Sequence, residues 1–182
     1  MKIITGNPGT GKHTVAKAVA RRLNLNLMDI NRIAISEKVV KKGPGTLDVD
    51  VNKLKKIIDK GPRDALLVGH LAPYAVSGSR VELAVVLRRS PYSLEREYRK
   101  RGYAKKKALE NLGSEILGIT YHDTVKSFGR KKTFQFDTTG KSVSETAKRI
   151  ESLFSNGKAR DDDVDWLMTI SKKGDLKRFF PY

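Results

Sequence analysis

The first fourteen residues combine glycines, a lysine and hydroxyl side chains in an order suited to binding phosphate. A short apolar segment, Lys2–Thr5, leads into Gly6-Asn-Pro-Gly-Thr-Gly-Lys12, and a helical pattern begins directly after it. Glycines allow backbone N–H groups to point inward around phosphate oxygens, and the N-terminus of the following helix favours an anion. Because strand, loop and helix stand in the order of a phosphate-binding P-loop, an ordinary Gly/Pro turn is the less favoured interpretation.

Within this loop, Lys12 is the side chain expected to reach the β- and γ-phosphates of a nucleotide. One position departs from the usual pattern, because His13 stands where Ser or Thr would place a hydroxyl on Mg²⁺. Imidazole is a poor ligand for that hard cation, whereas the next residue offers a hydroxyl to the α-phosphate. The predicted nucleotide-binding residues of the loop are Gly9, Gly11, Lys12, His13 and Thr14.

Apolar patterns along the chain alternate between strands and helices, which predicts an α/β fold with a parallel sheet. Ligands of such sheets bind at the carboxyl ends of the strands, so the P-loop and the stretches after Val68 and Leu87 should lie together. A Gly43-Pro44-Gly45 breaker interrupts the pattern. Strands are predicted at residues 2–5, 25–30, 65–69, 83–87 and 133–137, and helices at 12–23, 31–41, 51–60, 91–101, 104–128 and 142–154.

The composition indicates one cytoplasmic domain without a membrane span. The chain has 182 residues, 38% of them hydrophobic, no cysteine and a formal net charge of +17. No segment approaches the ~20 apolar residues of a membrane helix, and the few apolar residues after Lys2 predict no signal peptide. The excess of positive charge favours nucleic acid or a ribonucleoprotein as a neighbour over a purely solubilising surface.

Several segments together resemble one family, the archaeal and eukaryotic adenylate-kinase-like NTPases that assist small ribosomal subunit maturation, also called atypical or nuclear adenylate kinases. The resemblance covers residues 1 to about 168, and its most distinctive piece begins at Arg101-Gly102-Tyr103. The segments that carry it are Gly6–Lys12, Gly69-His70-Leu71, Val86-Leu87-Arg88, Arg101-Gly102-Tyr103 with Lys107, Glu110-Asn111 and Glu115-Ile116, Phe136–Gly140 and Val164–Leu167.

The resemblance implies a P-loop nucleoside monophosphate kinase fold, with five parallel strands flanked by helices. An acceptor-nucleotide-binding segment would cover about residues 29–51 and a small lid about 100–110, within a kinase-like domain of residues 1–157 followed by a C-terminal tail, 158–182. The tail has two apolar points, Trp166-Leu167 and Phe179-Phe180. Docking of this tail on the core and binding of a partner both remain open.

The resemblance also implies an activity and partners. The activity is transfer of a phosphoryl group from ATP to AMP, with a slower ATPase. The partners are a platform ribosomal protein of the small subunit and the nearby rRNA. The alternative is a nucleotide-switched ribosome assembly factor with little or no kinase turnover.

Four residues are candidates for the chemistry. Lys12 would hold the donor phosphates and Arg101 resembles the family's lid arginine. Arg88, directly after a buried strand, would contact the acceptor or transferred phosphate, or it is a solvated charge at the helix entry. His70 would orient water or a phosphate oxygen, or it is structural.

Two departures from the family pattern concern magnesium. Val68 stands where the family usually has Asp or Glu, and His13 replaces the hydroxyl residue. Ordinary adenylate kinases, which the loop also resembles, have Gly at the His13 position and hold Mg²⁺ mostly through water, so we expect Mg²⁺ to be held mainly by phosphates and water. Asp29, Asp48 and Asp50 are the nearest carboxylates by topology. We therefore predict retained nucleotide binding with a weakened ATPase.

Overall fold

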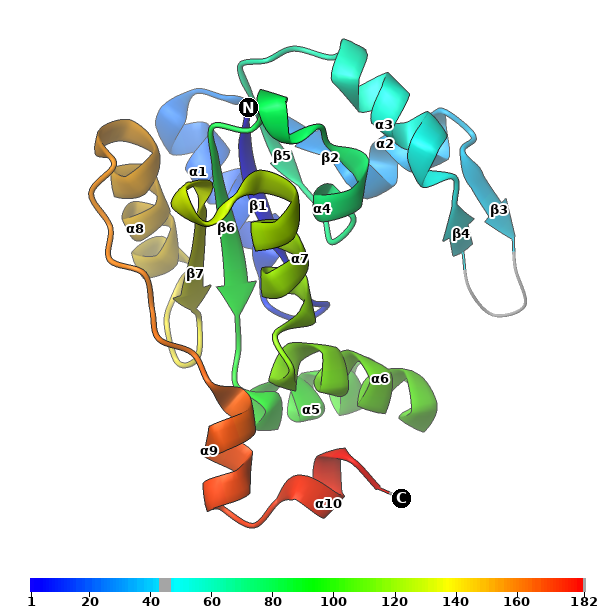
Figure 1. Cartoon of the computed structure of the whole chain (residues 1–182), viewed down its shortest axis with the longest axis vertical. Coiled ribbons are helices and arrows are strands. Elements are labelled where there is room, and N and C mark those ends of the chain that lie inside the picture. Colours follow the sequence, from blue (N-terminus) through cyan, green and yellow to red (C-terminus); the bar gives the residue numbers. More distant parts are fainter. Residues whose placement is uncertain (43–46, 182) are drawn as a thin grey trace.

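Five parallel strands form the central sheet, in the spatial order β2-β5-β1-β6-β7 (Figure 1). They are β1 (Lys2–Gly6), β2 (Asn26–Asp29), β5 (Ala65–Val68), β6 (Leu83–Arg88) and β7 (Thr133–Asp137). In the register of the sheet, Ile4 pairs with Val68 on one side and Val85 on the other. The predicted five-stranded parallel sheet is confirmed. The computed structural model describes residues 1–42 and 47–181, so the Gly43-Pro44-Gly45 breaker lies outside the described residues.

Helices cover both faces of the sheet, because alternate strand residues are apolar on both sides. Ile4, Leu66 and Val85 pack with α1 (Lys12–Leu23) and α8 (Val143–Asn156). Ile3, Leu67 and Ala84 pack with α3 (Val51–Lys60), α4 (Ala72–Ala75) and α7 (Ile119–Phe128), and α7 crosses the near face in Figure 1. The two cores fix the strands, and hence place their carboxyl ends at one edge of the sheet.

The predicted acceptor segment begins with a shorter helix than its sequence pattern predicts. Helix α2 is Ile30–Ser36 rather than residues 31–41, and its N-cap is Asp29, not Asn31. The Asp29 carboxylate accepts from the backbone N–H groups of Asn31 and Arg32. Lys38 then adopts a positive φ of 53°, and the chain turns into an antiparallel hairpin, β3 (Val40–Lys42) and β4 (Leu47–Val49), that projects from the body in Figure 1.

The predicted long helix at residues 104–128 is two helices. Helix α6 (Lys105–Ile116) is separated from α7 by Gly118, whose φ of 66° lies in the left-handed region. A Cβ at Gly118 would lie 3.6 Å from the Arg88 guanidinium, an ordinary contact, so it is the backbone conformation that favours glycine here. The break lets α6 lie with α5 (Pro91–Lys100) beyond the carboxyl ends of the strands, while α7 returns along the face of the sheet (Figure 1).

The C-terminal segment, residues 158–181, docks on the rest of the chain. Its first part runs along β7, where Asp162 N donates to the carbonyl of Gln135. Two short helices follow, α9 (Trp166–Lys172) and α10 (Leu176–Phe179), and their buried Ile170 and Phe179 pack against α5 and α6. Of the two alternatives for the tail, the structure shows docking, although Leu167 and other apolar residues of the segment remain exposed.

Two short 3₁₀ helices, η1 (Gly78–Arg80) and η2 (Arg130–Lys132), complete the elements of the described ranges. Within these ranges, none of the helices combines the length and the apolar composition that crossing a membrane requires.

Candidate functional site

The loop between β1 and α1 has the backbone shape that a phosphate-binding loop needs. Gly9 and Gly11 have φ values of 84° and 87°, which side-chain-bearing residues rarely adopt. Gly9 is also held close to its neighbours, since an added Cβ would lie 2.9 Å from Leu94 and 3.2 Å from Tyr98. Helix α1 starts at Lys12, so its free N–H groups point toward the loop. The arrangement presents positive backbone dipoles to an anion.

Lys12 is buried, with only 6% of its surface exposed, and its Nζ donates to the carbonyl of Asn7 at 3.3 Å. Burial, followed by the positive charge of Arg101, lowers the pKa of Lys12 to about 8, while the charge of Asp29 opposes this effect. A buried ammonium with so little local compensation lies in a site suited to an anionic ligand.

A pocket of about 1130 Å³ opens above this loop. It lies between the P-loop, α6, and the residues that follow β5. The structure brings into its lining every predicted site residue except Arg88. The lining residues that were predicted are Gly9, Gly11, Lys12, His13, Thr14, His70 and Arg101.

Arg101 reaches the pocket from the end of α5. Its Nε donates to the Glu97 carboxylate at 2.6 Å, one helical turn earlier, and about half of its side chain is exposed. It lies close enough to Lys12 for its charge to lower the pKa of that lysine. Two cations at one pocket repel each other until an anion binds between them, which suits a ligand carrying phosphates.

The two histidines of the site are mainly neutral at pH 7. His13 Nε2 lies 3.3 Å from Asp29 Oδ2, so the unusual P-loop residue contacts the end of β2. Burial, and then the charge of Lys12, lowers the pKa of His13 and also that of His70. Neutral imidazoles can accept or donate hydrogen bonds without adding charge.

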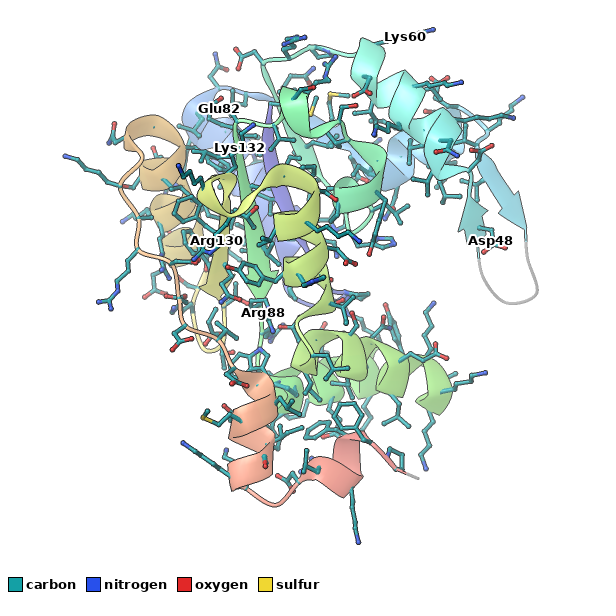
Figure 2. The ribbon with its side chains drawn as sticks, in the orientation of Figure 1. Asp48, Lys60, Glu82, Arg88, Arg130 and Lys132 are labelled. Atoms are coloured by element: carbon teal, nitrogen blue, oxygen red, sulfur yellow. The ribbon has the colours of Figure 1, made fainter. Side chains whose placement is uncertain are left out.

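Arg88 is not brought into the pocket. It is 3% exposed, and its guanidinium donates to the carboxylate and the backbone carbonyl of Glu115 at 2.8 and 2.7 Å. A third bond, at 2.8 Å, goes to Gln135 Oε1. Figure 2 shows Arg88 at the carboxyl end of β6. Neither a solvated charge nor a phosphate contact describes this geometry, because the side chain is enclosed and paired on several sides.

The residues around the pocket fit a directly coordinated Mg²⁺ poorly. No carboxylate lines the pocket among the described residues, and no cluster of three metal-binding side chains occurs in the same ranges. Asp29 Oδ1 caps α2, while Asp50 caps α3 by accepting from Lys53 N. Val68 packs in the apolar core with α1, so a carboxylate at this position would be enclosed by apolar side chains.

A second, smaller pocket of about 460 Å³ adjoins the first. Asn31 and His70 line both. The smaller pocket lies between the predicted acceptor segment and the residues that follow β5, and Asp48, on the hairpin in Figure 2, lines it. Its other lining residues are mainly apolar: Ala34, Ile35, Val40, Val49, Val51 and Leu71.

The sequence pattern did not assign functions to several residues that build the site. Asn7 anchors the loop, and Ser114 and Thr120 each donate to its Oδ1 at 3.1 Å. Asn111 lines the larger pocket, and its buried Nδ2 has no hydrogen-bond partner among the described residues. Asn111 and Glu115 belong to the family-like motif that begins at Arg101, and this motif is the sequence feature that could have identified them as site residues.

The chain is similar in sequence to several known proteins. A family model described as an AAA domain matches residues 3–118, more than half of the chain. The "Putative adenylate kinase" of Pyrococcus abyssi is 31% identical over 166 residues, covering 90% of this chain and 89% of the relative. That of Methanocaldococcus jannaschii is 30% identical over 169 residues, covering 90% of each. The chain belongs to this family of adenylate-kinase-like P-loop NTPases. The family resemblance seen in the sequence is thereby confirmed, and the part of it that concerns ribosomes stays a prediction.

Solved structures agree with the fold. The YorR protein from Bacillus subtilis, in complex with phosphorylated GDP, superimposes with a TM-score of 0.58 at 18% identity, covering 87% of this chain and 99% of that one. Shikimate kinase from Acinetobacter baumannii, in complex with shikimate, gives 0.55 at 16% identity, covering 87% and 95%. At these identities the likeness shows the P-loop kinase fold alone.

The lowered pKa of Lys12 makes nucleotide affinity depend on pH. A phosphate ligand favours charged Lys12, so above pH 8 the free protein must take up a proton on binding. We expect the Kd for ATP to rise between pH 8 and 10, by at most about tenfold per pH unit. Isothermal titration in buffers of different ionisation heat measures both the Kd and the proton uptake.

The matched control is Lys12→Arg, whose guanidinium stays charged throughout this range. It should bind ATP without proton uptake above pH 8. Equal pH dependence in both proteins would show that another group titrates.

Proposed function

We propose that this protein is a nucleoside monophosphate kinase that transfers a phosphoryl group from ATP to AMP, with a slow ATPase activity. The observation that carries the proposal is the pair of adjoining pockets that share Asn31 and His70. The larger one contains the P-loop and both phosphate-directed cations. The smaller one is mainly apolar, with Asn31 and Asp48 as polar groups, and suits a nucleobase.

In this reaction an oxygen of the AMP phosphate attacks the γ-phosphorus of ATP. A new P–O bond forms, the bond to the β,γ-bridging oxygen breaks, and two ADP molecules result. Such a transfer depends mainly on alignment and on neutralising charge. We assign charge neutralisation to Lys12 and Arg101, and the positioning of the phosphates between the two pockets to His70.

Mg²⁺ would enter with ATP, held mainly by phosphate oxygens and water, because the pocket lining offers no carboxylate among the described residues. The names of the archaeal relatives support an adenylate kinase. The absence of cysteine fits a cytoplasmic setting.

The direct test is ADP formation from ATP and AMP, with other nucleoside monophosphates as alternative acceptors. We expect AMP to be the best acceptor, and Lys12→Ala to lower kcat/KM by about 100-fold or more, since it removes a preorganised charge. A wild-type protein that binds ATP but forms no ADP with any acceptor would contradict the kinase assignment.

His13 should limit turnover more than binding. His13→Ser restores the hydroxyl that usually faces Mg²⁺ and releases Asp29 from its contact with the imidazole. We expect ATP hydrolysis and transfer to rise about tenfold or more, the effect of a single hydrogen bond to a charged group, while the Kd for ATP changes little. His13→Ala, which lacks the hydroxyl, is the control. If His13→Ser and His13→Ala are equally active, the serine hydroxyl does not contribute to turnover, and the explanation by a missing hydroxyl is wrong.

A second candidate function is a nucleotide-switched ribosome assembly factor with little kinase turnover, binding a platform ribosomal protein and rRNA. It is favoured by the net charge of +17 and by a strongly basic, exposed stretch beside the larger pocket. The stretch comprises Arg99, Lys100, Arg101, Lys105, Lys106 and Lys107, and it would attract a polyanion through counterion release.

A pull-down with and without ATP, probed for the platform ribosomal protein and for rRNA, tests this second function. We expect both to be retained and their amounts to depend on nucleotide. Neutralising Lys105 and Lys106 together, as Gln, should lower rRNA recovery most strongly at low salt. If the recovered amounts do not depend on ATP, nucleotide does not act as a switch. If neither the ribosomal protein nor rRNA is recovered, the proposed assembly function is wrong.

A further inference from the structure

The P-loop rests against a second layer of the protein, formed by α5 and α6. The hydroxyl of Tyr98 donates to the carbonyl of Pro8 at 2.7 Å, and Arg89 Nη1 donates to the carbonyl of Gly9 at 2.7 Å. Gly9 itself lies against Leu94 and Tyr98. The outer side of the loop is therefore set by residues of α5 and its entry rather than by the sheet alone.

The fully buried Glu115, on α6, joins this layer to the loop. Its Oε2 accepts from Asn7 Nδ2 at 2.7 Å. Its Oε1 accepts from Arg88 Nε at 2.8 Å, and from the backbone N–H of Arg89 and the indole Nε1 of Trp166, each at 3.1 Å. One carboxylate thus contacts the P-loop, the end of β6 and the C-terminal segment.

Asn7 passes this constraint to the phosphate-binding groups. Both polar atoms of its side-chain amide are hydrogen-bonded: Nδ2 donates to Glu115, and Oδ1 accepts from the hydroxyls of Ser114 and Thr120. Its backbone carbonyl accepts from Lys12 Nζ at 3.3 Å and from Thr10 Oγ1 at 2.9 Å. A shift of Glu115 would therefore reach Lys12 through one residue.

Trp166 is the point at which the C-terminal segment meets this network. It is half-buried, and it is held there by a segment that buries Ile170 and Phe179 against α5 and α6. Tyr92 of α5 fixes the same segment elsewhere, by donating to Asp175 Oδ2 at 2.6 Å.

We propose that Glu115 and Trp166 are positioning residues of the nucleotide site: the docked C-terminal segment, through the indole N–H, holds Glu115, which orients Asn7 and the phosphate-binding loop. The proposal rests on nucleotide binding at the P-loop, which is part of the proposed function. It makes the C-terminal segment a determinant of nucleotide affinity, although the segment does not line the pocket.

The test is the full-length variant Trp166→Phe, which keeps an aromatic side chain and removes the indole N–H donor together with the five-membered part of the ring. Glu115 keeps its other partners, so no buried charge is left unpaired and the protein should fold. We expect the Kd for ATP, by isothermal titration, to rise roughly fivefold, the lower end of measured couplings between sites.

Tyr92→Phe is the matched control, because it also removes one hydrogen bond of the C-terminal segment, and that bond goes to Asp175 and not to Glu115. We expect both variants to lower the melting temperature slightly and only Trp166→Phe to weaken ATP binding. A third comparison places Trp166→Phe in an Asn7→Ala background, where it should have no further effect on the Kd, since the path is already broken.

An unchanged Kd in Trp166→Phe, or equal losses of affinity in Trp166→Phe and Tyr92→Phe, would overturn the proposal. Full additivity with Asn7→Ala would also overturn it, because the coupling would then not run through Asn7. Lys12→Ala distinguishes a failure of this proposal from a failure of the nucleotide site. If Lys12→Ala binds ATP like the wild type, the nucleotide site itself is wrong, whatever Trp166→Phe does.

Discussion

The buried pair of Arg88 and Glu115 is the interaction on which the arrangement around the site depends. Two charges removed from water are stable only if each is paired and its remaining donors or acceptors are satisfied. Here Arg88 also bonds Gln135 and the Glu115 carbonyl, while Glu115 also accepts from Asn7, Arg89 and Trp166. Removing either partner would strand the other charge, at a cost of about 3–5 kcal/mol. The last turn of α6 is therefore fixed relative to β6 and the P-loop.

The buried pair also shows that the cationic side chains near the site have two different roles. Some are paired inside the protein, and others face the pocket. Arg88 follows a sheet strand at the edge where ligands bind, yet its charge is used inside the protein. Lys12, Arg101 and Lys107 carry the positive charge that faces the pocket. Burial, followed by the positive charge of Arg101, lowers the pKa of Lys12 to about 8, and the charge of Asp29 only partly opposes this. A rigid loop with an underpaired ammonium is preorganised for phosphate, since ligand binding supplies the missing negative charge.

Local sequence signals predicted the sheet and the P-loop, because glycine spacing and apolar runs act over a few residues. Seven of the 17 residues that line the larger pocket were predicted as site residues. Features set by distant partners were missed. The pairing of Arg88 with Glu115 spans 27 residues, and the end of α6 depends on the left-handed Gly118, inside a segment of otherwise helical pattern. Asp29 took the cap position expected of Asn31, since either residue type can cap a helix. Docking of the C-terminal segment depends on a surface that α5 and α6 form only after folding.

The same geometry explains why a P-loop can depart from its pattern at His13 and keep its shape. The loop's conformation is held from outside, by Glu115 through Asn7, by Tyr98 and by Arg89, and none of these contacts uses the side chain that follows Lys12. His13 is instead tied to Asp29 at the end of β2. The conformation of the phosphate-binding loop and the position of the His13 side chain therefore depend on different contacts. A substitution at position 13 would break the contact with Asp29 and leave the hydrogen bonds of Asn7, Tyr98 and Arg89 that hold the loop in place.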